Sequence, residues 1–221
     1  MLGQSKSETV YAAVRDRILA GDYAPGVRLV LSRVATEFEM SPVPVREAVR
    51  RLEAEGLVRY TRNVGAEVLG INTRGYVEAM ETVAYLEGVA TALAAPQVTT
   101  ADLAAARRVN AAMQEGLRRL DPVAFSTLNE QFHRVLCRPC PNSRLLGLLC
   151  RAWEDLSRVR HSTFIFVPER SGASVQEHAR LLDLIESQAP AADIESAART
   201  HKLHTLRALT RYMDDTDAAA G

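Results

Sequence analysis

The sequence predicts a mainly α-helical chain in two parts: an N-terminal unit of three helices and a β-hairpin, followed by an all-α helical bundle. Three observations lead to this prediction. Apolar residues recur at helical spacing through most of the 221 residues. Two short extended stretches lie close together within residues 57–69. After residue 72 the composition becomes rich in alanine and leucine, with almost no strand pattern.

The first part has the element order of a winged helix-turn-helix. Helical periodicity predicts helices over residues 9–20, 32–40 and 41–56, with an extended piece at 28–30 before the second. Ser32 and Ser41 are suited to cap the second and third helices, and Pro42 costs no hydrogen bond at a first helical position. Strands over 57–60 and 66–69 then form a small β-hairpin wing.

The second part, from Arg74 to Met213, is divided by turn signals at Pro96, 121–122, 139–142, 168–172 and 189–190, which leaves room for about six helices. We place the first domain at residues 1–72, an all-helical second domain at 73–214 and a disordered tail at 215–221.

Charge and cysteine content limit the functional classes. The 27 basic and 27 acidic residues balance, so a case for nucleic-acid binding must come from local placement. Cys137, Cys140 and Cys150 are an odd number, which favours reduced thiols over a disulfide scaffold, with a thiolate metal site at the first two as an alternative to a helix end and turn. We find no signal peptide and no apolar run near ~18 residues, so we expect a cytoplasmic protein without a membrane partner.

The third helix and the wing carry the features of a DNA-reading surface. A recognition helix needs small or polar residues at its exposed N-terminal end and arginines that hold phosphates. Ser41, Val43, Arg46, Arg50 and Arg51 lie near or along its outer side, and the wing tip at 62–65 is suited to a minor groove. The alternative is that these arginines form solvated faces paired with glutamates.

The stretch SPVPVREAVRRLEAEGLV, residues 41–58, resembles the signature of the GntR superfamily of bacterial transcription regulators. The resemblance implies DNA binding, with Arg46 reading a base and Arg28 and Arg50 contacting the backbone. The candidate DNA-binding residues are Arg28, Ser41, Val43, Pro44, Arg46, Arg50, Arg62, Asn63 and Gly65. The chain departs from the family at Leu31, Glu39 and Pro42, and the last replaces an arginine that would contact DNA.

Histidines recur across the bundle at spacings that suit a metal site. Asn129 and His133 lie four apart on one helix, His178 lies on a later one, and His201 and His204 lie three apart on the last. Imidazole suits zinc, nickel, copper or iron, and an amide oxygen adds a harder ligand. The alternative is that these are ordinary core or pocket histidines.

The stretches LNEQFH at 128–133, EH at 177–178 and AARTH at 197–201 resemble the ligand-binding (FCD-type) domain of the FadR subfamily. The resemblance implies a divalent metal, zinc, nickel or similar, held by Asn129, His133, His178 and His201. His204 stays an alternative to His201 as the ligand from the last helix, and the one that does not bind the metal donates a hydrogen bond to the effector or faces solvent. Asn129 stands where an aspartate is more usual, which should weaken metal binding.

The family resemblance also implies an acidic effector that fills open positions on the metal. Val83 occupies the place of an arginine usual in the family, so Arg158 or Arg160 takes over that role or lies on a solvated face. With His204 they are our candidate effector-binding residues. A sugar acid, a dicarboxylate, a fatty acyl group and an amino-acid derivative all stay open as effectors.

The sequence thus predicts a homodimeric transcription regulator, a repressor that leaves a palindromic double-stranded operator when a small organic acid binds the bundle. An activator is one alternative. Another is a metal-dependent hydrolase using the histidines. Against it, no glutamate lies in an HExxH arrangement, and we expect Glu177 to point away from the site on its helix.

Overall fold

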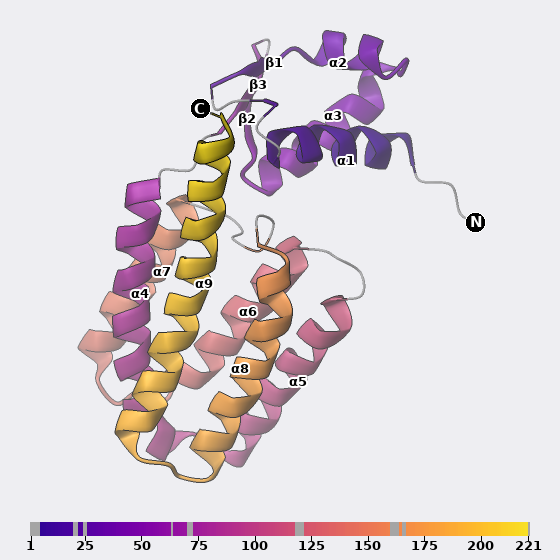
Figure 1. Cartoon of the computed structure of the whole chain (residues 1–221). Coiled ribbons are helices and arrows are strands. Elements are labelled where there is room, and N and C mark those ends of the chain that lie inside the picture. Colours follow the sequence, from indigo (N-terminus) through magenta and orange to yellow (C-terminus); the bar gives the residue numbers. More distant parts are fainter. Residues whose placement is uncertain are drawn as a thin grey trace. The chain divides into compact units, whose positions relative to one another are not determined.

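The computed structural model of the chain describes residues 5–19, 22–23, 26–62, 64–69, 73–117, 122–159, 164 and 167–220. The chain divides into two compact units, Met1–Ile71 with Asp214–Gly221 (unit 1) and Asn72–Met213 (unit 2). Within the described residues there are nine α-helices, one 3-10 helix and three strands, which confirms the mainly α-helical fold (Figure 1). None of the helices in this part of the chain is long and apolar enough to span a membrane.

Unit 1 is a winged helix-turn-helix. Its elements are α1 (Lys6–Leu19), β1 (Arg28–Leu29), α2 (Leu31–Glu37), α3 (Pro42–Ala54), β2 (Val58–Thr61) and β3 (Gly65–Val68). The three strands form an antiparallel sheet in the order β1-β3-β2. The predicted hairpin is therefore present, and the extended piece before α2 joins it as a third strand.

Local sequence explains how α3 is held. Val45, Val49 and Leu52 repeat at helical spacing and are buried, since α3 packs against α1. Pro42 occupies the first turn, after Ser41 in an extended N-cap conformation. The predicted cap of α2 was wrong: the Val30 carbonyl already accepts from the next turn, so α2 begins at Leu31 and Ser32 lies inside it.

Glu39 and Gly65 are two of the four described residues of unit 1 that have a positive φ. Glu39, in the turn between α2 and α3, has φ 52°, a conformation in which glycine is the residue of lowest strain. Gly65 has φ 117°, and a Cβ there would lie 2.8 Å from the carbonyl oxygen of Leu29. The glycine therefore lets the wing approach β1 closely.

Unit 2 is an all-helical bundle. Its elements are α4 (Thr73–Ala94), the 3-10 helix η1 (Ala95–Gln97), α5 (Thr100–Gly116), α6 (Pro122–Cys137), α7 (Ser143–Val159), α8 (Glu169–Glu186) and α9 (Ala191–Ala220). One apolar cluster includes Phe132, Leu136 and Leu182. A second includes Val83, Leu149 and Cys137.

The two cysteines of the CxxC pair are core residues. Cys137 and Cys140 are both buried in the second apolar cluster. Burial raises the pKa of the Cys137 thiol far above its usual range, so the thiolate that a metal would need is disfavoured. The structure therefore favours a helix end and turn here.

Helix α9 is longer than the sequence predicts. It continues to Ala220 through the part for which we expect a disordered tail. Alanine has the highest helix propensity, and no glycine or proline interrupts the chain before Gly221. Figure 1 shows α9 beside α4, and a Cβ at Gly88 of α4 would lie 3.0 Å from Cβ of Arg199 and 3.1 Å from the carbonyl oxygen of Glu195.

Candidate functional site

A hollow between α3 and the wing gathers three of the predicted DNA-binding arginines. It has a volume of about 370 Å³ and is lined by Leu31, Arg46, Val49, Arg50, Tyr60 and Arg62. All three guanidinium groups are exposed. One surface thus combines the cationic side chains of α3 and the wing, as a phosphate-contacting face requires.

Two apolar side chains of α3 and the wing are also exposed. Val43 is 62% exposed at the start of α3, and Val64 is exposed at the wing. Exposed valines at these places suit contact with a thymine methyl group. Ser41 is also exposed, and its hydroxyl makes no capping hydrogen bond. Pro44 is half-buried.

The other predicted DNA-binding residues have different positions. Arg28 is exposed on β1, paired in register with Glu67 of β3. Gly65 owes its identity to the close approach of the wing to β1 described above. Asn63 lies outside the described residues.

Arg51 of α3 belongs to a separate, partly buried network, which we call the closed cluster: Glu8, Tyr11, Arg51 and Glu55. The Tyr11 hydroxyl donates to Glu55 Oε1 at 2.7 Å. The Arg51 guanidinium lies 3.7 Å from the centre of the Tyr11 ring and donates to Glu8 at 2.7 Å. Burial raises the pKa of Tyr11 to about 12 and also raises the pKa of Glu55. The Arg51 guanidinium is therefore held by contacts with Tyr11 and Glu8 within unit 1.

In unit 2, three helices bring three histidines to one point. His133 of α6, His178 of α8 and His201 of α9 are buried, and one ring nitrogen of each lies within 4.8 Å of the others. His178 Nε2 and His201 Nε2 are 3.2 Å apart. Phe132 stacks on the His178 ring with centroids 4.0 Å apart, which fixes the ring plane.

The opposite nitrogen, Nδ1, of each ring faces a fixed acceptor. His133 Nδ1 lies 2.7 Å from Glu87 Oε1, and His201 Nδ1 lies 2.7 Å from Glu177 Oε2. His178 Nδ1 lies 3.1 Å from Asn110 Oδ1, and the Asn110 amide donates to the Val175 carbonyl at 3.0 Å, which fixes which way the amide points. With its proton on Nδ1, each ring would present a lone pair at Nε2, as a metal ligand requires.

The protonation states favour a cation at the centre. Burial lowers the pKa of His133 and of His178, and it lowers that of His201 to about 3, so all three rings are uncharged at neutral pH. The 3.2 Å between His178 Nε2 and His201 Nε2 suits a hydrogen bond between the two rings or two ligands of one ion. His133 Nε2 and Asn129 Oδ1 are buried without a hydrogen-bond partner. The three histidines could hold a divalent metal ion, and Asn129 shares the cavity wall with His133 and His201.

Glu87 of α4 connects this centre to its surroundings. Its Oε2 accepts a hydrogen bond from Trp153 Nε1 at 2.9 Å and lies 3.4 Å from Lys202 Nζ. Burial alone would raise the pKa of Glu87, but the contacts with His133, Lys202 and Trp153 outweigh it and bring the pKa to about 2. Glu87 is thus a buried anion.

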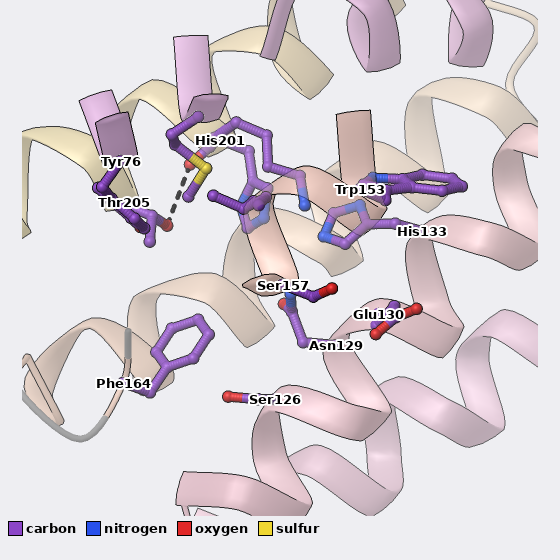
Figure 2. A pocket seen from close by; sticks show the side chains of 13 residues that line it. Tyr76, Ser126, Asn129, Glu130, His133, Trp153, Ser157, Phe164, His201 and Thr205 are labelled. Carbon is purple, nitrogen blue, oxygen red and sulfur yellow. Dashed lines mark hydrogen bonds between the residues drawn. The ribbon is translucent and has the colours of Figure 1, made fainter. Parts of the chain in front are cut away.

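A small cavity of about 120 Å³ adjoins the histidines (Figure 2). Asn129, His133 and His201 are part of its wall, together with Lys202 and Thr205. Apolar walls come from Tyr76, Met80, Trp153, Leu156 and Phe164. Figure 2 shows Asn129 and Phe164 on opposite sides of the space below His201. A mostly apolar cavity with a few convergent polar groups is typical of a small-molecule site.

The predicted effector-binding residues are less central. His204 is half-exposed and contacts Glu177 Oε1 through Nδ1 at 2.8 Å; it is not in the cavity wall. Val83 is buried in the second apolar cluster. Arg160 and the side chain of Arg158 lie outside the described residues.

Sequence reasoning missed the residues behind the histidines. Glu87 follows the buried Val83 by four positions, so a carboxylate on the apolar face of α4 was the available signal. Asn110 and Lys202 gave no comparable signal. The expectation for Glu177 was wrong, because it contacts His201 and His204 and pairs with Arg170.

Comparison with known proteins gives matches in both units. The family model described as bacterial regulatory proteins, gntR family, matches residues 6–68, and the FCD domain model matches residues 78–204. A probable D-xylose utilization operon transcriptional repressor of Paenarthrobacter nicotinovorans is 29% identical over 200 residues, or 87% of this chain and 85% of that protein. A gluconate operon transcriptional repressor of Bacillus licheniformis is 29% identical over 182 residues, covering 79% and 70%.

Solved structures agree in fold. A GntR family member from Pseudomonas syringae pv. tomato is 28% identical and has a TM-score of 0.51 over 98% of this chain and 89% of that chain. The Listeria monocytogenes protein Lar, which controls expression of the agr system, is 20% identical with a TM-score of 0.56, covering 96% and 99%.

Proposed function

The chain belongs to the GntR family of bacterial regulatory proteins and carries an FCD domain, and from this premise we propose that it is a repressor that releases operator DNA when its bundle binds a small organic acid. The coarser statement, a DNA-binding transcription regulator, follows from the family and from relatives named as transcriptional regulators. The observation that carries the finer one is the convergence of Asn129 and three uncharged histidines beside a cavity.

Arg46, Arg50 and Arg62 supply the DNA contacts in this proposal, with Val43 against a base edge. Their exposure on one face supports the role. Ser41 and Pro44 at the start of α3 and Arg28 on β1 contribute backbone contacts in this proposal, and the protein works in the cytoplasm.

The DNA-binding proposal is tested with labelled duplexes enriched from genomic DNA by the purified protein. Arg46→Ala should weaken specific binding by roughly tenfold or more and reduce discrimination against random duplex, because a base contact is worth ~1–3 kcal/mol. Arg199→Ala, on α9, is the control and should bind as the unaltered protein does. If Arg46→Ala bound specific DNA and random DNA with the same two affinities as the unaltered protein, the assigned role would be contradicted.

The metal proposal assigns His133, His178, His201 and Asn129 as ligands of a divalent ion such as zinc or nickel. The ion would provide a positive centre for an acidic effector, because these donors are all uncharged and leave the charge of the ion uncompensated. Relatives named for xylose and gluconate operons support a carbohydrate-derived acid.

Elemental analysis of purified protein tests the metal site. We expect about one ion per chain, lost in His178→Ala and retained in His204→Ala, since His204 faces Glu177 at the surface. Thermal shifts against a panel of organic acids should then show stabilisation of the metal-loaded form only. Retention of metal by His178→Ala would refute the ligand set.

Homodimerisation is the third component of the proposal. Tyr85, Val89 and Leu93 lie four residues apart on α4 and are all exposed, as an apolar stripe that suits a second copy of the chain. Two copies would place two recognition helices on a palindrome. Sedimentation of Val89→Asp should show a shift towards monomer; a monomeric unaltered protein that still responds to an acid would contradict this component.

A further inference from the structure

Lys202 is a buried cation with too few partners. It follows His201 on α9, its side chain is 9% exposed, and it is part of the cavity wall. Its contact among the described residues is Glu87 Oε2, 3.4 Å from Nζ. An ammonium group has three donors, and a buried charge normally needs close pairing with hydrogen bonds. Lys202 therefore has donor capacity left on the cavity side.

The other charged side chains near the cavity have partners in the protein. Arg170, which is not in the cavity wall, pairs with Glu177 and donates to the His201 carbonyl at 3.1 Å through Nη2, while its buried Nη1 has no partner among the described residues. Glu130 accepts from Arg134 at 2.7 Å at the surface. Lys202 is the one ammonium or guanidinium group in the described cavity wall. An anion entering the cavity meets it directly.

We propose that Lys202 is a specificity-determining residue that binds the acidic group of the effector, next to the centre formed by the three histidines and Asn129. This inference rests on the proposed function and deepens that function by naming the residue that binds the charged group of the ligand. Glu87 positions the ammonium at the cavity wall, and the same carboxylate orients His133. An acid should therefore bind more tightly than the corresponding uncharged alcohol, because both the proposed metal ion and the Lys202 ammonium attract its negative charge.

A purely structural role for Lys202 makes a different prediction. If Lys202 only neutralised Glu87, its loss would leave a buried anion and disturb His133, so metal content and stability would fall together. If Lys202 binds the ligand, its loss removes anion affinity while metal content is kept. The two roles can therefore be separated by measuring both quantities on the same sample.

The experiment uses full-length protein loaded with Ni²⁺ and titrated calorimetrically with glycolate, a small hydroxy acid suited to a cavity of this size, and with ethylene glycol as its uncharged counterpart. Lys202→Met should raise the Kd for glycolate by roughly 10- to 100-fold, because a hydrogen bond to a charged group contributes ~1.5–3 kcal/mol. Nickel per chain should not change. Arg199→Met, three residues away on α9 and paired with Glu195, should leave both values unaltered.

A double variant, Glu87→Gln with Lys202→Met, covers the case in which the single variant fails to fold, because it leaves no unpaired buried charge. It too should have lost glycolate affinity at saturating nickel. Equal glycolate affinity in the variants and the unaltered protein, no glycolate binding by the unaltered protein, or loss of nickel with Lys202→Met would each overturn the inference. DNA binding by the same preparations, measured separately, reports on the proposed function.

Discussion

Each unit of the molecule buries a glutamate that accepts a hydrogen bond from an aromatic side chain, yet the two networks end differently. Glu55 in unit 1 receives the Tyr11 hydroxyl and Arg51, and the closed cluster ends on protein atoms. Glu87 in unit 2 receives Trp153 and faces His133, whose Nε2 has no partner. A network whose polar atoms are all paired within the protein stabilises the fold. A network that ends on unpaired polar atoms beside a cavity can instead bind a ligand.

The largest expected effect lies in the closed cluster. Glu55→Leu leaves the Tyr11 hydroxyl and part of Arg51 without an acceptor and should lower the free energy of unfolding by about 2–3 kcal/mol. Urea denaturation followed by circular dichroism measures this. Glu47→Leu, on the exposed face of α3, is the matched control and should stay within about 0.5 kcal/mol. Equal effects of the two substitutions would show that the cluster contributes little to stability.

A substitution in the network of Glu87, Trp153 and His133 should change the affinity for metal. Glu87→Gln removes the anion that orients His133, and outer partners of this kind typically change metal affinity by about 10- to 100-fold. Chelator competition gives the affinity. Glu78→Gln, paired with Arg74 on the exposed face of α4, should have no effect. An unchanged affinity in Glu87→Gln would mean that His133 is held by packing alone.

A smaller effect distinguishes the two networks in metal-free protein. Asn129→Leu removes an oxygen that has no partner, so the free energy of unfolding should be unchanged or slightly higher. Tyr11→Phe in the closed cluster should instead cost about 1 kcal/mol. Chemical denaturation in the presence of a chelator tests both. A clear loss of stability in Asn129→Leu would indicate that the amide is satisfied within the protein.

The smallest effect is a pH dependence from Glu55. Burial raises the pKa of Glu55, so the folded state holds its proton more tightly than the unfolded state does. The contribution of Glu55 to stability is therefore most favourable below its unfolded pKa and declines as the pH rises from there through the folded pKa. Stability measured across this window should fall less with pH in Glu55→Gln than in the unaltered protein, and parallel curves would contradict the raised pKa.

Local patterns in the sequence were sufficient for most of the fold. The repeat of Val45, Val49 and Leu52 with Pro42 at the start predicts α3, and alternation predicts the wing, because both signals depend on neighbours within a few residues. The pairing of β1 with β3 joins residues 28 and 67, far apart in the chain, and local patterns carry no information about it. The helical pattern was followed only to Met213, whereas α9 continues to Ala220.

The candidate site also has residues that the sequence predicts and residues that it does not. Spacing and resemblance selected Asn129, His133, His178 and His201, and the structure brings the three histidines together. Glu87, Asn110 and Lys202 come from three other places in the chain and act through contacts that only folding creates. Their roles could not be read from spacing, because nothing in α4 or α5 indicates which helix lies opposite.

The departure at Glu39 has a physical explanation in the structure. A side chain at φ 52° is strained by roughly 1–2 kcal/mol relative to glycine, which has no Cβ to collide with the backbone. The family pattern places glycine in this turn, and the chain keeps the same backbone conformation with a glutamate.

The close contact at Gly88 gives α4 and α9 a mechanical property. Any side chain at this position would push against Arg199 and the Glu195 carbonyl, so the glycine permits the two helices to interlock at the residue next to Glu87. Interlocked helices resist sliding along each other, and a force applied at Lys202 on one is shared by the other. We therefore expect α4 and α9 to shift together, and not separately, when a ligand displaces either helix.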